Sequence, residues 1–189
     1  DNDKKNEVNL INIKSNISHN FKLPNNYVFF HYKHNLFGNL LKWKLEDVIY
    51  FLKFLSTKYE NVLFSSELNN KYVNDFFMQK FNTLDFDKNI IKSKNDNNIF
   101  FLKNIDGYNL FDTVKNSKKI IAPEGIITHI GYFLNKSPLA LMHFNLKSRK
   151  DFISQIISCK EWFPPDNYKF IVLKKDVNQS IKKLTKRIN

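Results

Sequence analysis

The sequence predicts an α/β protein built on a doubly wound, parallel, Rossmann-like sheet. Short runs of apolar, β-branched and aromatic residues alternate with longer segments whose apolar residues recur every three or four positions. This alternation places parallel strands in the centre and helices on both faces, because strand-to-strand crossovers are right-handed. The chain has 189 residues, of which 42% are hydrophobic, enough for one domain with a substantial core.

The expected strands are short runs rich in aromatic and β-branched residues, bounded by polar or turn residues. They span Tyr27–Tyr32, Asn61–Phe64, Asn98–Leu102, Lys119–Ala122, the residues after Pro138, and Tyr168–Leu173. Residues 82–97 are polar and are expected to form a loop that contains one short strand, Asn89–Lys92. Residues Lys33–Lys42 are expected to form a polar loop.

The expected helices lie between these strands and after the last one. They span Trp43–Tyr59, Asn70–Phe81, Leu110–Asn116, the residues after Gly125, Asp151–Ser158, and Val177–Ile188. The first shows the amphipathic spacing most clearly, at Leu45, Val48, Ile49, Leu52 and Leu55. The segment Trp162–Pro165 interrupts the pattern before the last strand.

The composition limits the class of protein and its surroundings. Residues 1–20 are polar and predict a linker or incoming segment, which leaves 21–189 as the Rossmann-like domain; the initial Asp1 indicates a processed protein or a piece of a longer one. No apolar run approaches the roughly 18 residues of a membrane span, and no signal peptide is recognisable. Cys159 is the single cysteine, which excludes an internal disulfide and agrees with a cytoplasmic location.

The formal net charge of +12 has two interpretations. Lysine dominates it, with only Arg149 and Arg187 as arginines, and the abundance of Lys, Asn and Ile is what an AT-rich genome encodes. We prefer this interpretation, in which the lysines decorate a solvated surface. The alternative is attraction to anions, including nucleotide phosphates, nucleic acid or the anionic inner face of a membrane. Sequence-specific DNA readout is disfavoured because it depends on arginine.

Ligands of doubly wound sheets bind outside the carboxyl ends of the strands. This rule selects four loops: His31–Lys42, Ser65–Asn69, Asn104–Tyr108 and Ala122–His129. The last is the strongest candidate, because a strand leads through Gly125 into a helix whose first-turn N–H groups and dipole favour an anion. Gly125 is one of four glycines, and a plain turn would also require it.

The polar residues of these loops are the candidate ligand contacts. Glu124 serves either as a helix cap or as an acceptor for a ribose or base, and Thr128 either as an ordinary helix residue or as a phosphate donor. His129, in the first helical turn, is as often structural as functional. Lys42 is a candidate phosphate partner, and Glu67 follows the second strand, where an acidic residue commonly binds a ribose hydroxyl.

Several other chemistries find no support in the sequence. His31 and His34 lie close together, but no third residue completes a metal site at a suitable spacing, so we expect no metal. The phosphate-binding patterns GxxxxGK[ST] and GxGxxG and the nucleophile pattern GxSxG are all absent from the sequence. A P-loop hydrolase, a dinucleotide dehydrogenase and an α/β-hydrolase are therefore disfavoured.

The segment Asn109–Leu141 resembles the donor-site signature of glycosyltransferase family 9, the ADP-heptose:lipopolysaccharide heptosyltransferases. In that family a strand ends in Asp-[Ser/Thr]-Gly, a helix carries a histidine, and a basic-Pro step leads to another buried strand. Gly125, His129 and Lys136-Ser137-Pro138 match these features. Pro123 and Glu124 replace the Asp-[Ser/Thr] pair, and one additional residue separates Gly125 from His129.

A second stretch carries the same resemblance. Lys42-Trp43 with Glu46 is similar to the Lys-x-Trp or Arg-Trp-Pro-x-Glu stretch that opens the first helix of the family's donor domain. The resemblance implies that Lys42 contacts the donor phosphates and that Glu67 lies near the ribose. As an order of elements the likeness covers about residues 27–175, but only these two stretches match at the level of motifs.

The resemblance implies a C-terminal, donor-binding half of a two-domain GT-B glycosyltransferase. The expected ligands are a nucleotide-sugar donor and a glycan or glycolipid acceptor of the lipopolysaccharide type, with no cofactor or metal required. The expected partner is an N-terminal GT-B domain that supplies the catalytic base, so no catalytic residue is assigned here. Two alternatives stay open: a nucleotide- or nucleic-acid-binding module, and a non-catalytic glycosyltransferase-like scaffold.

Overall fold

The computed structural model describes residues 22–67, 71–87, 89–103, 107–143 and 169–188. Eight strands form one sheet: β1 (Tyr27–Tyr32), β2 (Asn61–Ser66), β3 (Thr83–Asp87), β4 (Ile90–Ser93), β5 (Ile99–Leu102), β6 (Lys119–Pro123), β7 (Leu139–Met142) and β8 (Lys169–Val172). The helices are η1 (Asn35–Leu40), α1 (Leu45–Ser56), α2 (Lys71–Lys80), α3 (Gly107–Asn116), α4 (Ile126–Phe133) and α6 (Val177–Ile188).

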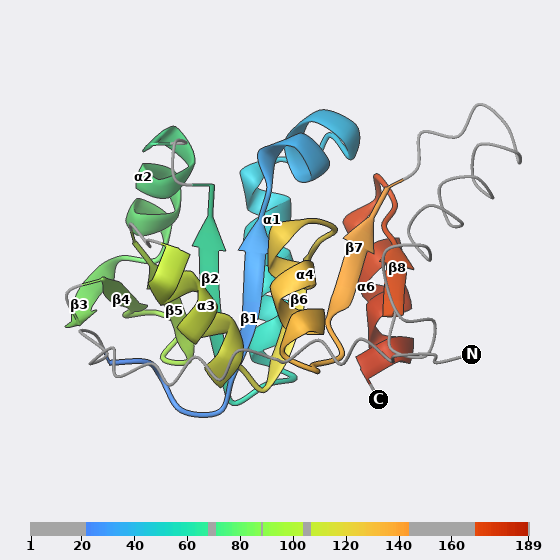
Figure 1. The fold of residues 1–189 in the computed structure, drawn as a ribbon. Helices are drawn as coiled ribbons and strands as arrows, with labels where there is room; N and C mark the ends of the chain where they lie inside the picture. The colour runs from blue at the N-terminus through green and yellow to red at the C-terminus, as the bar shows by residue number, and fades with distance from the viewer. Residues whose placement is uncertain (1–21, 68–70, 88, 104–106, 144–168, 189) are drawn as a thin grey trace, which may run out of the picture.

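The strand order is β3-β4-β5-β2-β1-β6-β7-β8 (Figure 1). All neighbouring strands from β5 to β8 pair in parallel, and only the β3-β4 and β4-β5 pairs are antiparallel. Counted along the chain, the six parallel strands have the order 3-2-1-4-5-6 of the Rossmann fold. The predicted α/β, doubly wound, Rossmann-like fold is therefore confirmed, as a mixed and mostly parallel sheet.

Alternate side chains of the strands bury two apolar layers, one on each face of the sheet. The larger layer packs against η1, α1, α2 and α6, and centres on Phe30, whose ring lies 5.3 Å from that of Phe51 and 5.7 Å from that of Phe64. The smaller layer packs against α3 and α4 and includes Phe29 and Leu63. Figure 1 shows α3 and α4 in front of the sheet and α1 behind it, which is the arrangement of a doubly wound sheet.

The prediction of a polar loop at Lys33–Lys42 is wrong, because residues Asn35–Leu40 form a π-helix. Leu36 and Phe37 are buried in the larger apolar layer, which draws this segment against the sheet. The Leu41 N–H donates to the carbonyl of Leu36, five residues earlier, at 3.0 Å. Lys42 then adopts a left-handed conformation (φ 60°), so α1 begins at Leu45 and not at the predicted Trp43.

The prediction of a loop over residues 82–97 with one short strand is also incomplete. Strands β3 and β4 form an antiparallel hairpin there, with an irregularity in the register between Asp85 and Asp87. Strand β3 lies at the edge of the sheet, and its burial is only partial, so its sequence lacks the apolar run that marks a central strand. Strand β4 falls within one residue of the predicted Asn89–Lys92.

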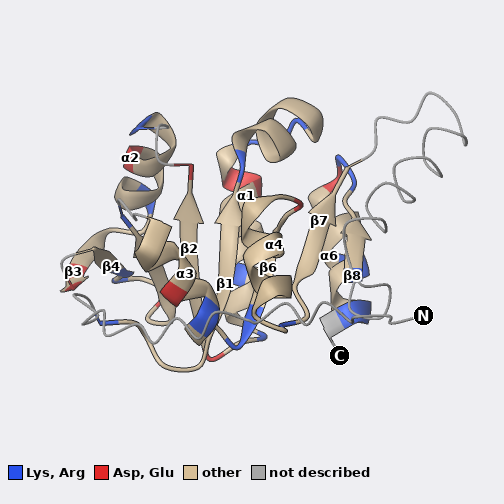
Figure 2. Ribbon diagram, viewed as in Figure 1, with Lys and Arg blue, Asp and Glu red and all other residues tan. Residues whose placement is uncertain are grey.

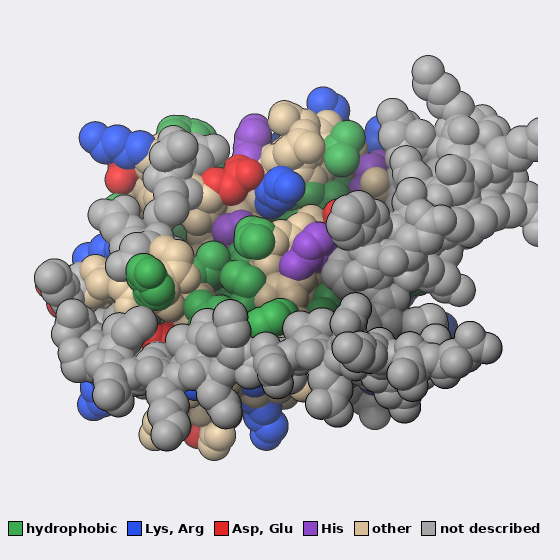
Figure 3. Space-filling view, viewed as in Figure 1, with side chains coloured by type: hydrophobic (Ala, Val, Ile, Leu, Met, Phe, Trp, Pro, Cys, Tyr) green, Lys and Arg blue, Asp and Glu red, His purple; other side chains and the backbone are tan. Residues whose placement is uncertain are grey.

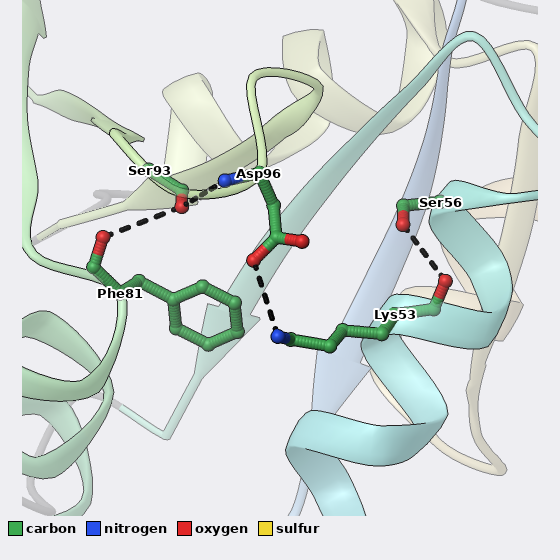
Figure 4. A network of polar contacts seen from close by, with 5 residues as sticks. All are labelled: Lys53, Ser56, Phe81, Ser93 and Asp96. Atoms are coloured by element: carbon green, nitrogen blue, oxygen red, sulfur yellow. Dashed lines mark hydrogen bonds and ion pairs between the residues drawn. The ribbon is translucent and has the colours of Figure 1, made fainter.

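Polar contacts near the amino ends of the strands fasten the hairpin to α1 (Figure 4). The Lys53 ammonium lies 3.6 Å from the Asp96 carboxylate, and the Asp96 N–H donates to Ser93 Oγ at 2.9 Å. Ser93 Oγ in turn donates to the Phe81 carbonyl at 3.3 Å. This network joins α1, the end of α2 and the β4–β5 turn, so its role is structural.

Some predictions lie outside the described residues. These are the linker at 1–20, the helix Asp151–Ser158 and the interruption at Trp162–Pro165. Among the described residues, no helix is both long and apolar enough to cross a membrane.

Candidate functional site

The sheet has a topological switch point between β1 and β6, where the chain turns to opposite faces. Strand β1 leads to η1 and α1 on one face, and β6 leads to α4 on the other. Parallel strands that diverge in this way leave a crevice at their carboxyl ends, which is where doubly wound proteins bind ligands. The β6–α4 connection, the strongest candidate from the sequence, lies at this crevice.

The β6–α4 turn is shaped by Gly125 and Thr128. Gly125 has φ 145° and ψ −155°, a region open essentially to glycine alone, and the space that a Cβ would occupy is empty. The buried hydroxyl of Thr128 donates to the Gly125 carbonyl at 2.7 Å and accepts from the Gly125 N–H at 3.1 Å. The Thr128 hydroxyl is therefore committed to the turn.

The first-turn N–H groups of α4 are without partners in the described part of the chain. The first helical hydrogen bond runs from the His129 N–H to the Gly125 carbonyl at 3.0 Å. The amides of Ile126, Ile127 and Thr128 precede it and have no carbonyl to reach within the helix. Three donors and the positive end of the helix dipole therefore converge at the switch point.

Three other helices, η1, α1 and α6, carry a carboxylate at their starts. Glu67 accepts from the His34 N–H before η1 at 2.9 Å, and Asp47 accepts from the Lys44 N–H before α1 at 2.8 Å. Asp176, the residue before α6, accepts from the Asn178 N–H in the first turn of that helix at 2.8 Å. At α4 a neutral hydroxyl, that of Thr128, takes the corresponding position, so the anion that suits this helix start is not supplied by a cap.

Glu124 and His129 form the rim of the turn. His129 Nε2 lies 3.3 Å from Glu124 Oε1, and both side chains are about two-fifths exposed (43% and 41%). Glu124 immediately precedes the glycine, so its carboxylate is an acceptor beside the amide donors. The predicted residues Glu124, Gly125, Thr128 and His129 are therefore brought together in one turn.

The other two predicted residues lie on the β1 and β2 side of the crevice. Glu67 follows β2 and accepts the His34 N–H, so its carboxylate has a structural partner. Lys42 is exposed at the far end of η1. No described hydrogen bond or ion pair joins either residue to the Gly125 turn.

His31, at the carboxyl end of β1, is suggested by the sequence only as a metal ligand, and that role is rejected because no third ligand has a suitable spacing. Its Nδ1 is 2.8 Å from Ser65 Oγ of β2, where the parallel register places the two residues side by side. Burial, assisted by the charge of Lys33, lowers the pKa of His31 to about 4, so the ring is neutral at physiological pH. The sequence signal available for His31 was the alternation of side chains along β1, which places His31 and Tyr32 on opposite faces of the sheet.

Figure 3 shows this face in space-filling form, with histidine, basic and acidic side chains gathered around hydrophobic ones near the upper ends of the central strands. Figure 2 shows acidic residues at the same upper edge and many of the basic residues at the lower one. Within the described ranges, no group of three or more His, Cys, Asp or Glu residues could hold a metal ion. The site is thus a set of N–H donors with one carboxylate at its rim.

Two cavities lie on the opposite face, beside α2. One, of about 330 Å³, is lined by Tyr32, His34, Trp43, Tyr72 and other residues between η1, α1 and α2. The other, of about 240 Å³, lies between α2 and the ends of β2 and β5. Neither includes a residue of the β6–α4 turn.

No protein-family model matches the chain, and no curated protein matches it. Among solved structures, the fold is similar to that of UDP-GlcNAc 2-epimerase from Methanocaldococcus jannaschii, crystallised with UDP-GlcNAc and UDP. The TM-score is 0.53 at 11% identity, over 88% of this chain and 39% of the epimerase, so the chain spans about two-fifths of that protein's length. The comparison shows that the chain shares its Rossmann-like α/β fold with part of this epimerase.

Proposed function

We propose that this chain is the donor-binding domain of a glycosyltransferase, and that the β6–α4 turn holds the diphosphate of a nucleotide-sugar. The observation that carries the proposal is the start of α4 at the switch point, where three amide donors converge and no described protein acceptor binds them. Phosphate oxygens accept hydrogen bonds and carry the negative charge that a helix start favours. The solved epimerase with UDP-GlcNAc and UDP supports a nucleotide-sugar as the ligand class.

The residues of the turn have separate roles in this proposal. Gly125 and Thr128 set the backbone, the amides of residues 126–128 bind the phosphates, and the Glu124 carboxylate accepts from a ribose hydroxyl once it leaves His129. The resemblance to family 9 implies that Lys42 contributes positive charge from the β1–α1 connection. Stabilising the departing diphosphate in this way lowers the barrier to sugar transfer.

Transfer itself needs groups that the resemblance places in an N-terminal domain, namely the base and the site for a glycan or glycolipid acceptor. Family 9, the heptosyltransferases, is our proposal for the relationship. The proposed chemistry uses backbone dipoles and a lysine to neutralise the diphosphate, which needs no metal.

Calorimetric titration of the chain with UDP, ADP, UDP-GlcNAc and uridine tests the proposal. We expect the diphosphates and the nucleotide-sugar to bind and uridine to bind at least about tenfold more weakly, because the site recognises phosphate. A chain that binds none of the three phosphate-bearing ligands contradicts the proposal. Binding to plain RNA that falls steeply with salt and is not displaced by nucleotides would instead favour the nucleic-acid-binding alternative.

A further inference from the structure

Strand β1 divides its side chains between the two faces of the sheet. Phe30 and Tyr32 belong to the apolar layer beneath α1 and α2, while Tyr27 and Phe29 belong to the layer beneath α3 and α4. Because successive side chains of a strand alternate, His31 lies on the α4 face. It is therefore on the same side of the sheet as the open helix start, at the carboxyl end of the strand that borders the switch point.

The hydrogen bond to Ser65 orients the His31 ring, and it can form with either neutral tautomer because a hydroxyl both donates and accepts. Ser65 is 3% exposed, and His31 Nδ1 is the one described partner of its hydroxyl. We assign the tautomer in which the Ser65 hydroxyl donates to Nδ1, because it leaves the ring hydrogen on the nitrogen that faces away from Ser65. The ring is neutral, so its single hydrogen is on Nε2, which has no hydrogen-bond partner in the described part of the protein.

The neighbours of His31 leave this Nε2–H donor without a protein acceptor. On β6 the register pairs Phe30 with Ile121, which places Ala122 beside His31, and alanine has no polar side-chain atom. Lys33 lies two residues further along the chain, and it is close enough for its charge to lower the pKa of His31. The α4 side of β1 thus presents one neutral donor at the strand end, with the charge of Lys33 nearby, and the β6–α4 turn follows the neighbouring strand.

We propose that His31 and Lys33 complete the phosphate site of the α4 start, with Lys33 supplying the positive charge and His31 a fixed neutral N–H donor. This inference rests on the proposed function, and it replaces Lys42 by Lys33 as the principal cation. The groups proposed to contact the phosphates are all donors, which suits the oxygens of a diphosphate because these only accept hydrogen bonds; the Glu124 carboxylate lies at the rim, paired with His129. Ser65 is a positioning residue, since it acts through the ring of His31.

The first test compares two lysines of the same β1–α1 connection, using UDP as the probe in calorimetry. Lys33→Met and Lys42→Met remove the same charge and replace it with a similar apolar chain. We expect Lys33→Met to weaken UDP binding by about tenfold or more and Lys42→Met by less than about threefold. Equal effects of the two substitutions, or a larger effect of Lys42→Met, would overturn the assignment of Lys33.

The second test separates hydrogen bonding by His31 from a purely structural role. His31→Gln offers an amide N–H near the position of Nε2, whereas His31→Leu fills the space without a donor. We expect His31→Gln to retain UDP affinity within about threefold, His31→Leu to lose about tenfold, and Ser65→Ala to fall between them. If His31→Gln binds as weakly as His31→Leu while both unfold cooperatively, the donor role of His31 is wrong.

Different results would contradict the proposed function and the proposed role of His31 and Lys33. A wild-type chain that binds no UDP overturns the proposed function and this inference together. A wild-type chain that binds UDP, with His31→Leu and Lys33→Met indistinguishable from it, overturns this inference and leaves the proposed function standing. If His31→Leu does not fold, the comparison of Lys33→Met with Lys42→Met still tests the inference, because Lys33 is only half-buried, Lys42 is exposed and neither belongs to an apolar layer.

Discussion

The starts of η1 and α4 stand on opposite sides of the same switch point, and the protein treats them differently. Before η1, the His34 N–H is held by the Glu67 carboxylate at 2.9 Å. Before α4, the Gly125 N–H is held by the neutral Thr128 hydroxyl, and the amides of residues 126–128 have no described partner. One helix start is closed by the protein's own anion, and we propose that the other binds an anion from outside.

The difference arises from how far apart in sequence the capping groups lie. Glu67 comes from the end of β2, 33 residues from His34, and reaches η1 only because β1 and β2 are neighbours in the sheet. Thr128 is three residues from Gly125 and caps its own helix, whatever the sheet does. The closed start depends on the tertiary fold, whereas the open one is encoded locally.

Disturbing the backbone conformation at the start of α4 should have the largest effect on ligand binding. Gly125→Val places a β-branched residue at φ 145°, where only glycine is comfortable, and we expect UDP binding to fall by at least about 100-fold and unfolding free energy by roughly 1–3 kcal/mol. Calorimetry and chemical denaturation measure the two effects. Gly107→Ala is the control, since a Cβ there also meets no neighbouring atom and its φ is not positive, and it should leave binding unchanged.

On the β1 side of the switch point, the pH dependence of the unfolding free energy tests the burial of His31. The pKa of His31 is about 4 in the folded protein and 6.5 for an ordinary histidine, so between these values the unfolded chain binds more protons. Stability is therefore fully present above pH 6.5 and is lost as pH falls towards 4, by at most about 3 kcal/mol.

Denaturation of the wild type and of His31→Gln across pH 4–7 measures this contribution as a difference. The substitution removes the titrating ring, so the difference in unfolding free energy should change over this range in the direction stated. A constant difference would show that His31 is not held neutral by burial, which would also weaken its assignment as a fixed donor.

A carboxylate introduced at the start of α4 should make this helix start resemble that of η1, which the protein's own carboxylate caps. Ile126 is 68% exposed at the first position of α4, so Ile126→Glu adds a negative charge there without disturbing the core. We expect about tenfold weaker UDP binding together with a gain in stability of roughly 0.3–1 kcal/mol from the helix dipole. Ile126→Gln has the same length without the charge and should bind as the wild type does; equal losses in both variants would indicate a steric effect.

Removing the carboxylate that caps η1 should have the smallest effect on ligand binding. Glu67→Ala leaves the His34 N–H without its acceptor, and we expect a loss of about 1 kcal/mol in unfolding free energy with UDP affinity changed by less than about twofold. Glu67→Gln keeps an oxygen acceptor and should lose less. If Glu67 binds the ribose, as the resemblance implies, Glu67→Ala will instead weaken UDP binding while leaving inorganic pyrophosphate binding unchanged.

Strong local signals made the fold and part of the site predictable. The apolar runs located the central strands, and the single glycine between a strand and a helix located the β6–α4 turn. The role of Glu67 as a cap and the pairing of His31 with Ser65 depend on the register between β1 and β2, and no local pattern encodes that register. The π-helix escaped prediction because its apolar residues are few and follow neither usual period.

The β3–β4 hairpin has a consequence for the protein's behaviour in solution. Strand β5, with the sequence Ile-Phe-Phe-Leu, is buried along its whole length and pairs with β4 on its outer side. Outermost is β3, which carries Asp85 and Asp87 and an irregular register between them. Charges and irregularities on an edge strand discourage another chain from adding to it. A chain that lost this hairpin would present an uncharged aromatic edge and would be prone to aggregate through it.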